Sequence, residues 1–346
     1  MPHQKSLKHI LAELPHPFRV PDAPDVVVKG ISIDSRAVQP GQLFVAMTGG
    51  TADGHNYIQK AIDNGAVAVV GEKDMAGISV PYIRLENTRQ ALTWMAGAFH
   101  DWPGRKLAVI GVTGTDGKTT TTNLLYQILL AADIKAGMIS TVNAVIGGEV
   151  LDTGFHVTTP DAHDVQRYLA RMVEAGLTHV VLETTSHGWS QHRVDACEFD
   201  IGVVTNITHE HMNEHGTFEN YRAAKARLFS SLEITLPKPQ GNPRLGVINR
   251  DDPKSFDFLN DFSGYNLRQF AFQIQTVLAL QILHSFDSPT SLQLTCTSFN
   301  SLRHNFQLNC TTTRTFNHRT GTTVQVTSVR LTNCVRTIRT ELGCVV

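Results

Sequence analysis

The chain has 346 residues, enough for two or three domains, and its 30 basic and 31 acidic side chains nearly balance. This balance argues against nucleic acid or a membrane surface as the main partner. The sequence has no apolar segment of signal-peptide type at its start and no apolar run long enough to span a bilayer, so we expect a cytoplasmic protein.

Residues 1–103 are predicted to form a small α/β domain. Short apolar strand signals alternate with turn signals such as Gln39-Pro40-Gly41, and a helical pattern precedes a buried strand. Two polar clusters, Asp34-Ser35-Arg36 and Asp53-Gly54-His55, fall in the connections between these elements. Polar loop residues are usually just solvated, so the clusters alone leave both a functional and a structural role open.

Residues 104–272 are predicted to form a second domain, opened by a phosphate-binding loop. The apolar run 107–112 leads into the Gly-rich turn 114–117, which Lys118 and a Thr-rich helix start follow. Glycines let N–H groups turn toward a phosphate, the helix N-terminus adds a positive dipole end, and the lysine neutralises phosphate charge. Thr119 is the candidate Mg²⁺ ligand. The spacing GxxGxxGKT departs from the usual GxxxxGK[ST], and a turn that binds nothing is the alternative.

The second domain repeats short apolar strand signals, with helical stretches between several of them. This pattern predicts a mostly parallel sheet covered on both faces, whose ligands gather where the strands end. Glu183 ends one strand signal, and His209-Glu210-His211 follows another. A carboxylate and an imidazole there can complete a magnesium site with Thr119 and ATP oxygens. The alternatives are a satisfied buried acid and loop histidines bonded to the backbone.

Several motifs, in order along the chain, resemble the Mur ligase family, MurE type, which adds the third amino acid of the peptidoglycan peptide. The resemblance covers about residues 25–265 and rests on DSRAVQPGQLFVAMTGGTADGH, GVTGTDGKTTTT, HVTTPD, ETTSHGWSQHRV, TNITHEHMNEHGTFENYRAAKARLF and VINRDDP. It implies an N-terminal UDP-sugar-binding domain followed by a P-loop central domain. The DSR and TTP blocks disfavour a P-loop NTPase that does mechanical or signalling work.

The resemblance also implies roles for the matched positions. Lys118, His211 and Lys225 would be catalytic, and Lys225 would be carbamylated, because a lysine amine that captures CO2 can bind Mg²⁺. An unmodified Lys225 would instead be a solvated helix lysine. The implied metal ligands are Thr119, Glu183, His211 and Lys225. The implied ATP-binding residues are Gly114, Thr115, Asp116, Gly117, Lys118, Thr119, Thr120, Asn249 and Asp252. The implied contacts to the UDP-sugar peptide are Ser35, Thr158, Thr159, Thr185, Gln191 and Arg193.

The implied reaction is ATP-dependent amide formation. The carboxylate of UDP-MurNAc-L-Ala-D-Glu attacks the γ-phosphorus of ATP, and the amine of an amino acid then displaces phosphate from the acyl phosphate. Positioning and electrostatic stabilisation of the transferring phosphoryl would supply most of the catalysis. The sequence contains no DNPR-type motif, so it leaves open whether diaminopimelate or lysine is added.

Residues 273–346 differ in composition from the rest of the chain. They contain 15 Thr, four of the five Cys and no Lys, and only Asp287 and Glu341 are acidic. They are β-prone, but turn signals are scarce and no C-terminal ligase domain is recognisable. We leave them unassigned and expect a reading-frame shift or a gene-prediction error, with a replacement domain as the alternative. The chain is therefore expected to ligate poorly or not at all, and a fragment that only binds nucleotide or UDP-sugar peptide is the alternative function.

Overall fold

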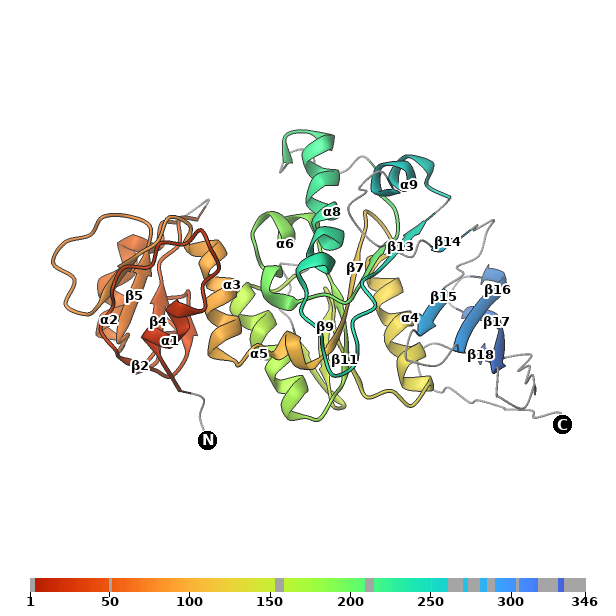
Figure 1. The fold of residues 1–346 in the computed structure, drawn as a ribbon, viewed down its shortest axis with the longest axis horizontal. Helices are drawn as coiled ribbons and strands as arrows, with labels where there is room; N and C mark the ends of the chain where they lie inside the picture. Colours follow the sequence, from red (N-terminus) through yellow and green to blue (C-terminus); the bar gives the residue numbers. More distant parts are fainter. Residues whose placement is uncertain are drawn as a thin grey trace. The chain divides into compact units, whose positions relative to one another are not determined.

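The computed structural model describes residues 4–49, 52–152, 159–208, 215–249, 251–260, 270–272, 281–284, 290–302, 305–316 and 329–332. The chain divides into two compact units, Met1–Arg244 and Leu245–Val346. Figure 1 labels many of the helices and strands of each unit. Within the described residues, no helix is long and apolar enough to cross a bilayer.

The first unit begins with a short antiparallel pair, β1 (Lys5–Ser6) with β2 (Val27–Val28). A small parallel sheet follows, whose four strands, in hydrogen-bonded order, are β3 (Ile31–Ser32), β4 (Leu43–Val45), β5 (Ala68–Gly71) and β6 (Tyr82–Arg84). The accompanying helices are α1 (Leu7–Ala12), η1 (Gly54–Tyr57), α2 (Ile58–Asp63) and α3 (Thr88–Phe99). The structure confirms the predicted α/β fold of this region.

Alternate residues of the small sheet pack on opposite faces, as the two-residue period of a strand requires. On β4, Leu43 and Val45 belong to an apolar cluster with Leu7 of α1 and Met95 of α3. Phe44, between them, belongs to a second cluster formed with α2. Helices therefore cover both faces of this sheet, which explains its continuous apolar strands.

The central sheet of the first unit is mostly parallel, as predicted. Its strands, in order, are β10 (Glu149–Asp152), β9 (Asn143–Ile146), β8 (Ala136–Ile139), β11 (His179–Glu183), β7 (Ala108–Thr113) and β12 (Ile201–Val204). The four strands β8, β11, β7 and β12 are parallel, while β9 pairs antiparallel with β8 and β10 pairs antiparallel with β9. All six residues of β7 are buried, which matches its unbroken apolar sequence.

Helices accompany the central strands on both sides. They are η2 (Pro103–Lys106), α4 (Lys118–Ala131), α5 (Ala162–Glu174), α6 (Ser186–Ser190), η3 (Asp195–Cys197) and α8 (Phe218–Ile234). The connection through α4 runs from β7 past β11 to β8, and the connection through α5 returns to β11. Right-handed crossovers in these opposite directions place α4 and α5 on opposite faces, as Figure 1 shows. The carboxyl ends of β7, β8, β11 and β12 therefore meet at one edge.

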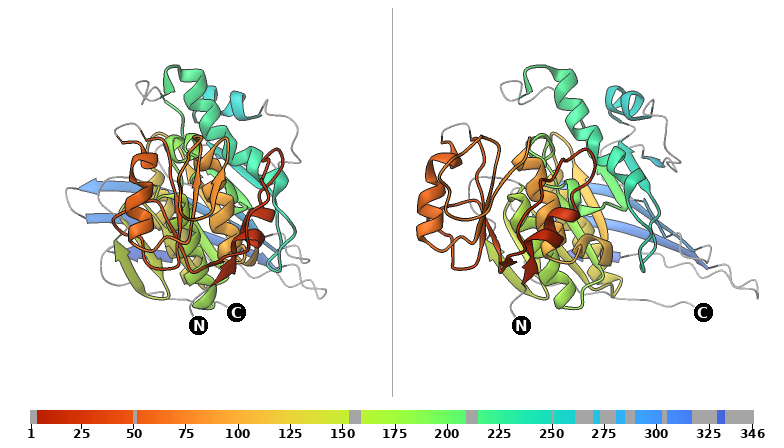
Figure 2. Two further views of the ribbon diagram at one scale, coloured as in Figure 1. Left: turned by 90° about the vertical axis from the view of Figure 1, so that its left-hand side faces the viewer. Right: turned by 60° about the vertical axis from the view of Figure 1, so that its left-hand side comes forward.

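The second unit contains two groups of strands. β13 (Leu245–Asn249) pairs in parallel with β14 (Phe270–Phe272), and α9 (Pro253–Asn260) lies between them in the chain. An antiparallel sheet has the order β15 (Gln281–His284), β16 (Thr290–Leu302), β17 (Asn305–Phe316) and β18 (Val329–Thr332). The β-prone composition of the C-terminal region is thus matched by strands in its described residues. Figure 2 shows the long β16 and β17 from two sides.

Candidate active site

The phosphate loop joins the end of β7 to the start of α4. Gly117 has a φ of 76°, in the left-handed region, and Lys118 begins the helix directly after it. Gly114 lies so close to the neighbouring segment that an added Cβ would be 1.9 Å from Thr205 Oγ1. The Lys118 ammonium donates to the Thr115 carbonyl at 2.6 Å. The two glycines therefore permit a tight turn that aims a helix N-terminus and a lysine at one place.

The segment that follows β12 supports this loop from the side. The Thr115 N–H donates to the Asn206 carbonyl at 2.8 Å, and the Asp116 N–H donates to Asn206 Oδ1 at 3.0 Å. The Thr205 hydroxyl donates to the Asp116 carbonyl at 2.6 Å. These three hydrogen bonds fix the conformation of the phosphate loop against residues 205–206. Neither Thr205 nor Asn206 was predicted from the sequence to have a role in the site.

Glu183, at the end of β11, meets the first turn of α4. Its side chain is fully buried, and both carboxylate oxygens accept from the Thr119 hydroxyl, at 2.9 and 3.0 Å. Thr141, two residues beyond β8, donates its hydroxyl at 2.9 Å and its N–H at 3.0 Å. The structure therefore brings together the two predicted ligands Thr119 and Glu183. Their oxygens are of the type that Mg²⁺ prefers, so the pair fits this ion.

Thr141 is a residue that the sequence analysis missed. It follows a short apolar strand, which is the same signal that pointed to Glu183. Among the residues that the structure describes, no three His, Cys, Asp or Glu side chains gather as a metal site. His211 lies outside the described residues, so the predicted link between Glu183 and an imidazole stays a prediction.

Lys225 approaches the phosphate loop from α8. Only 2% of this residue is exposed, so the alternative of a solvated helix lysine is wrong. Its amine donates to the Gly114 carbonyl at 2.6 Å and lies 4.5 Å from the centroid of the Tyr221 ring. The Tyr221 hydroxyl is 2.9 Å from Thr115 Oγ1. The helix therefore touches the loop through two buried side chains, and Tyr221 is a second residue that the sequence analysis missed.

A second cluster of predicted residues forms around Arg193. Its Nη1 donates to the Thr159 carbonyl at 2.6 Å, and its Nη2 donates to Gln191 Oε1 at 2.7 Å. Asp161 Oδ1 is 3.3 Å from its Nε, and the Thr159 and Thr185 hydroxyls are 3.2 Å apart. Burial lowers the pKa of Arg193, and Asp161 opposes that shift. Four of the predicted substrate contacts therefore lie together.

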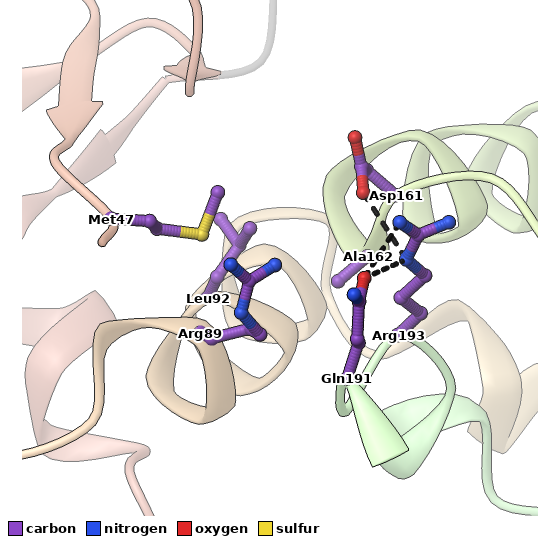
Figure 3. Close-up of a pocket in the computed structure, with 7 residues that line it drawn as sticks. All are labelled: Met47, Arg89, Leu92, Asp161, Ala162, Gln191 and Arg193. Carbon is purple, nitrogen blue, oxygen red and sulfur yellow. Dashed lines mark hydrogen bonds and ion pairs between the residues drawn. The ribbon is translucent and has the colours of Figure 1, made fainter. Parts of the chain in front are cut away.

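Figure 3 shows a pocket beside this cluster. Its lining residues are Met47, Arg89, Leu92, Asp161, Ala162, Gln191 and Arg193. The lining holds two guanidinium groups, of Arg89 and Arg193, and one carboxylate, that of Asp161, which Figure 3 shows paired with Arg193. The net charge of the lining is therefore positive, which suits an anionic group. The sequence analysis did not identify Arg89, since nothing in the helix pattern of α3 distinguishes it. Ser35 is buried in the connection from β3 to β4 and does not line this pocket.

The remaining predicted residues are Thr120, Thr158, Asn249 and Asp252. Thr120 is exposed on the first turn of α4, and Thr158 lies outside the described residues. In the second unit, Asn249 Oδ1 accepts from the Asp251 N–H at 2.9 Å. Asp252 Oδ1 accepts from the Ser255 N–H at 3.3 Å, at the start of α9. These are local contacts, so a role of Asn249 and Asp252 at ATP stays a prediction.

Two protein-family models match this chain. A family model described as the Mur ligase middle domain matches residues 112–315, and one described as the Mur ligase family, catalytic domain, matches residues 27–100. The chain belongs to the Mur ligase family. The predicted resemblance is thereby confirmed, and the middle-domain match extends beyond residue 272, where the sequence analysis ended the central domain.

Individual Mur ligases show how much of the family the chain covers. It is 42% identical over 260 residues to the UDP-N-acetylmuramyl-tripeptide synthetase of Roseiflexus sp. (strain RS-1), covering 73% of the chain and 51% of that relative. It is 40% identical over 234 residues to the UDP-N-acetylmuramoyl-L-alanyl-D-glutamate–2,6-diaminopimelate ligase of Geobacillus thermodenitrificans (strain NG80-2), covering 67% and 46%. A solved structure of a ligase with that same name superposes with a TM-score of 0.62 at 26% identity, covering 83% of the chain and 55% of that structure's chain. The chain spans about half the length of the curated relatives it matches.

Proposed function

We propose that this chain is the ATP- and substrate-binding part of an ATP-dependent amide ligase of peptidoglycan precursor synthesis. The proposed ligase adds diaminopimelate or lysine, as the third amino acid, to UDP-MurNAc-L-Ala-D-Glu. The observation that carries the proposal is the meeting of Thr119 with Glu183, at 2.9 Å, beside the phosphate loop and Lys118. The names of the relatives support this choice of substrate. We propose that the reaction takes place in the cytoplasm.

Each part of the phosphate site has a task in this proposal. The N–H groups at the start of α4 and the Lys118 ammonium bind the β- and γ-phosphates of ATP. Thr119 and Glu183 would hold Mg²⁺ together with His211 and the carbamate of Lys225. Bound Mg²⁺ offsets negative charge on the phosphoryl group that is transferred. The burial of Lys225 and its contact with Gly114 support this role, because they place its amine directly against the phosphate loop.

The cluster around Arg193 orients the second substrate. Arg193 and Arg89 supply positive charge for the carboxylates or phosphates of the UDP-sugar peptide, and Gln191, Thr159 and Thr185 supply hydrogen bonds. The free carboxylate of the dipeptide attacks the γ-phosphorus of ATP, which gives an acyl phosphate and ADP. An amine then attacks the acyl carbon and releases phosphate. The chain's residues act by holding the reacting groups in line.

Hydroxylamine trapping tests the proposal without depending on the amino-acid partner. Hydroxylamine converts an acyl phosphate into a hydroxamate. We expect ADP and hydroxamate to form when ATP, Mg²⁺ and UDP-MurNAc-L-Ala-D-Glu are all present, and neither to form with Lys118→Ala. Equal yields of hydroxamate from the wild type and Lys118→Ala would contradict the proposal.

A second candidate function follows from the length of the match. Because the chain spans about half of its relatives, it could act only as a binding fragment for nucleotide or UDP-sugar peptide. Saturable binding of both ligands without hydroxamate would favour this fragment. Absence of binding for both would contradict the two candidates together.

A further inference from the structure

The segment from Trp189 to Asp195 carries two predicted substrate contacts, Gln191 and Arg193. It begins in the last turn of α6 and continues past the end of that helix at Ser190, and His192 within it has a positive φ of 57°. The Arg193 N–H donates to the Gly188 carbonyl at 2.9 Å, so the chain folds back on the short helix. A non-glycine residue in the left-handed region costs free energy and needs support from its surroundings. The position of Arg193 therefore depends on what holds this segment.

Arg227, on α8, holds both ends of the 189–195 segment. Its Nη1 donates to the Trp189 carbonyl at 2.5 Å, and its Nη2 donates to both carboxylate oxygens of Asp195 at 3.0 Å. Its guanidinium carbon lies 5.7 Å from the centroid of the Trp189 ring. Asp195 also lies 2.6 Å from His192 Nδ1. One planar guanidinium thus binds a carbonyl in the last turn of α6 and the carboxylate of Asp195, beyond the end of that helix.

The same helix also reaches the phosphate loop. Lys225 precedes Arg227 by two residues, and residues two apart lie on different faces of a helix. One face of α8 therefore contacts Gly114 through Lys225, and another contacts the 189–195 segment through Arg227. The Arg227 side chain is 36% exposed and Asp195 only 10%, so the pair is partly desolvated and stronger than a fully exposed ion pair.

We propose that Arg227 is a positioning residue for the UDP-sugar peptide. It fixes the 189–195 segment so that Gln191 and Arg193 face the pocket, and it touches neither substrate itself. This inference rests on the proposed function. It assigns to Arg227 an effect on the affinity for the UDP-sugar peptide, with little effect on the affinity for nucleotide.

Calorimetric titration of the full chain tests this assignment. The probes are UDP-MurNAc-L-Ala-D-Glu and ADP with Mg²⁺, titrated separately. We expect Arg227→Met to weaken binding of the UDP-sugar peptide about tenfold and to leave the affinity for ADP within about twofold. Arg227→Lys should give an intermediate loss, since an ammonium can pair with Asp195 but lacks the planar fork. The matched control is Arg167→Met, because Arg167 pairs with Asp164 at 2.6 Å on the surface of α5.

The outcomes separate this inference from the proposed function. Equal losses for both ligands, or no loss for either, would overturn the positioning role of Arg227. A wild-type chain that binds ADP but not the UDP-sugar peptide would overturn the proposed substrate, and this inference with it. Where Arg227→Met lowers the melting temperature too far for titration, Arg227→Lys and Asp195→Asn decide. Loss of affinity for the UDP-sugar peptide alone supports the inference in both variants.

Discussion

The two parallel sheets of the first unit both carry polar residues in their connections, but these residues bond to different kinds of partner. In the small sheet, His55 Nδ1 is 2.6 Å from Asp53, and its Nε2 accepts the Glu72 N–H at 2.8 Å. In the central sheet, Glu183 accepts mainly from the hydroxyls of Thr119 and Thr141. A hydroxyl can rotate and offer its lone pairs to a cation, whereas a backbone N–H that bonds to a ring nitrogen fixes the fold.

The comparison suggests how to interpret polar motifs. Asp53-Gly54-His55 left both a functional and a structural role open, and the structure favours the structural one because His55 is 4% exposed with both ring nitrogens engaged. The Lys73 ammonium and the His55 ring hold the pKa of Asp53 well below its ordinary value. Arg36 likewise lowers the pKa of Asp34. The acidic and basic side chains of each motif in the small sheet therefore bond within that motif or to a nearby residue, while the central sheet presents hydroxyl and carboxylate oxygens that a ligand can engage.

The largest expected effect comes from the central sheet. Lys118→Ala should weaken ATP binding about 100-fold, because it removes a charged hydrogen-bond donor from the phosphate site. The melting temperature should hardly change, since the ammonium bonds to a carbonyl of its own loop. Calorimetric titration with ATP and Mg²⁺ measures this loss. The exposed Lys60→Ala is the control, and equal affinity of wild type and Lys118→Ala would refute the phosphate site.

The small sheet should respond in stability instead. His55→Ala should lower the free energy of unfolding by about 2 kcal/mol, because it leaves the Glu72 N–H and the Asp53 carboxylate without the buried ring that they share. ATP affinity should stay at the wild-type value. Urea unfolding and the same titration measure the two quantities. If His55→Ala lost much of its ATP affinity at unchanged stability, His55 would act in ligand binding and the structural role given to it here would be wrong.

A smaller effect tests the carboxylate of the central sheet. Glu183→Gln should abolish the gain in nucleotide affinity that Mg²⁺ provides, which we expect to be about tenfold in the wild type. The amide keeps the shape of the side chain but lacks the charge. Titrations of ADP with and without Mg²⁺ measure this gain. Glu183 would not be a metal ligand if the variant kept the full effect of Mg²⁺.

The smallest net effect concerns pH, because two aspartates shift in opposite directions. Burial raises the pKa of Asp200 from 3.8 to about 6, against the opposing effect of the Lys238 ammonium 2.6 Å away. Its contribution to stability is complete below pH 3.8 and is lost as pH rises through about 6. The contribution of Asp53, whose pKa is lowered, is present above pH 3.8 and is lost as pH falls.

Carboxyl carbon NMR shifts recorded against pH measure both aspartates directly. We expect Asp200 to titrate near pH 6 and Asp53 below its ordinary range. Asp53→Asn provides the assignment of one signal and should leave the other in place. Titration of both groups near pH 4 would contradict the opposite environments that the structure gives them.

The sequence could predict those parts of the site that are local in the chain. The strand, loop and helix around Lys118 are consecutive, and Glu183 directly ends an apolar run. Thr141, Asn206 and Tyr221 escaped prediction because their contacts depend on which strands are neighbours. The pairing of β8 with β11 brings Thr141 to Glu183, and the pairing of β7 with β12 brings Asn206 to the loop. Tyr221 reaches the loop from α8.

Burial was the other quantity that the sequence left undetermined. A lysine on an amphipathic helix is usually solvated, and nothing in YRAAKARLF shows that Lys225 is buried. Its contact with Gly114 crosses from α8 to the phosphate loop, 111 residues away in the chain. The fold class, in contrast, followed from the strand spacing and from the family motifs.

The most direct test of the account is a crystal structure of the chain grown with ADP and Mn²⁺, a stand-in for Mg²⁺ with a strong anomalous signal. We predict an anomalous peak bonded to Thr119 Oγ1 and Glu183, with the β-phosphate on the N–H groups at the start of α4 and on Lys118. A nucleotide bound elsewhere, or a Mn²⁺ ion that contacts neither Thr119 nor Glu183, would contradict the proposed site.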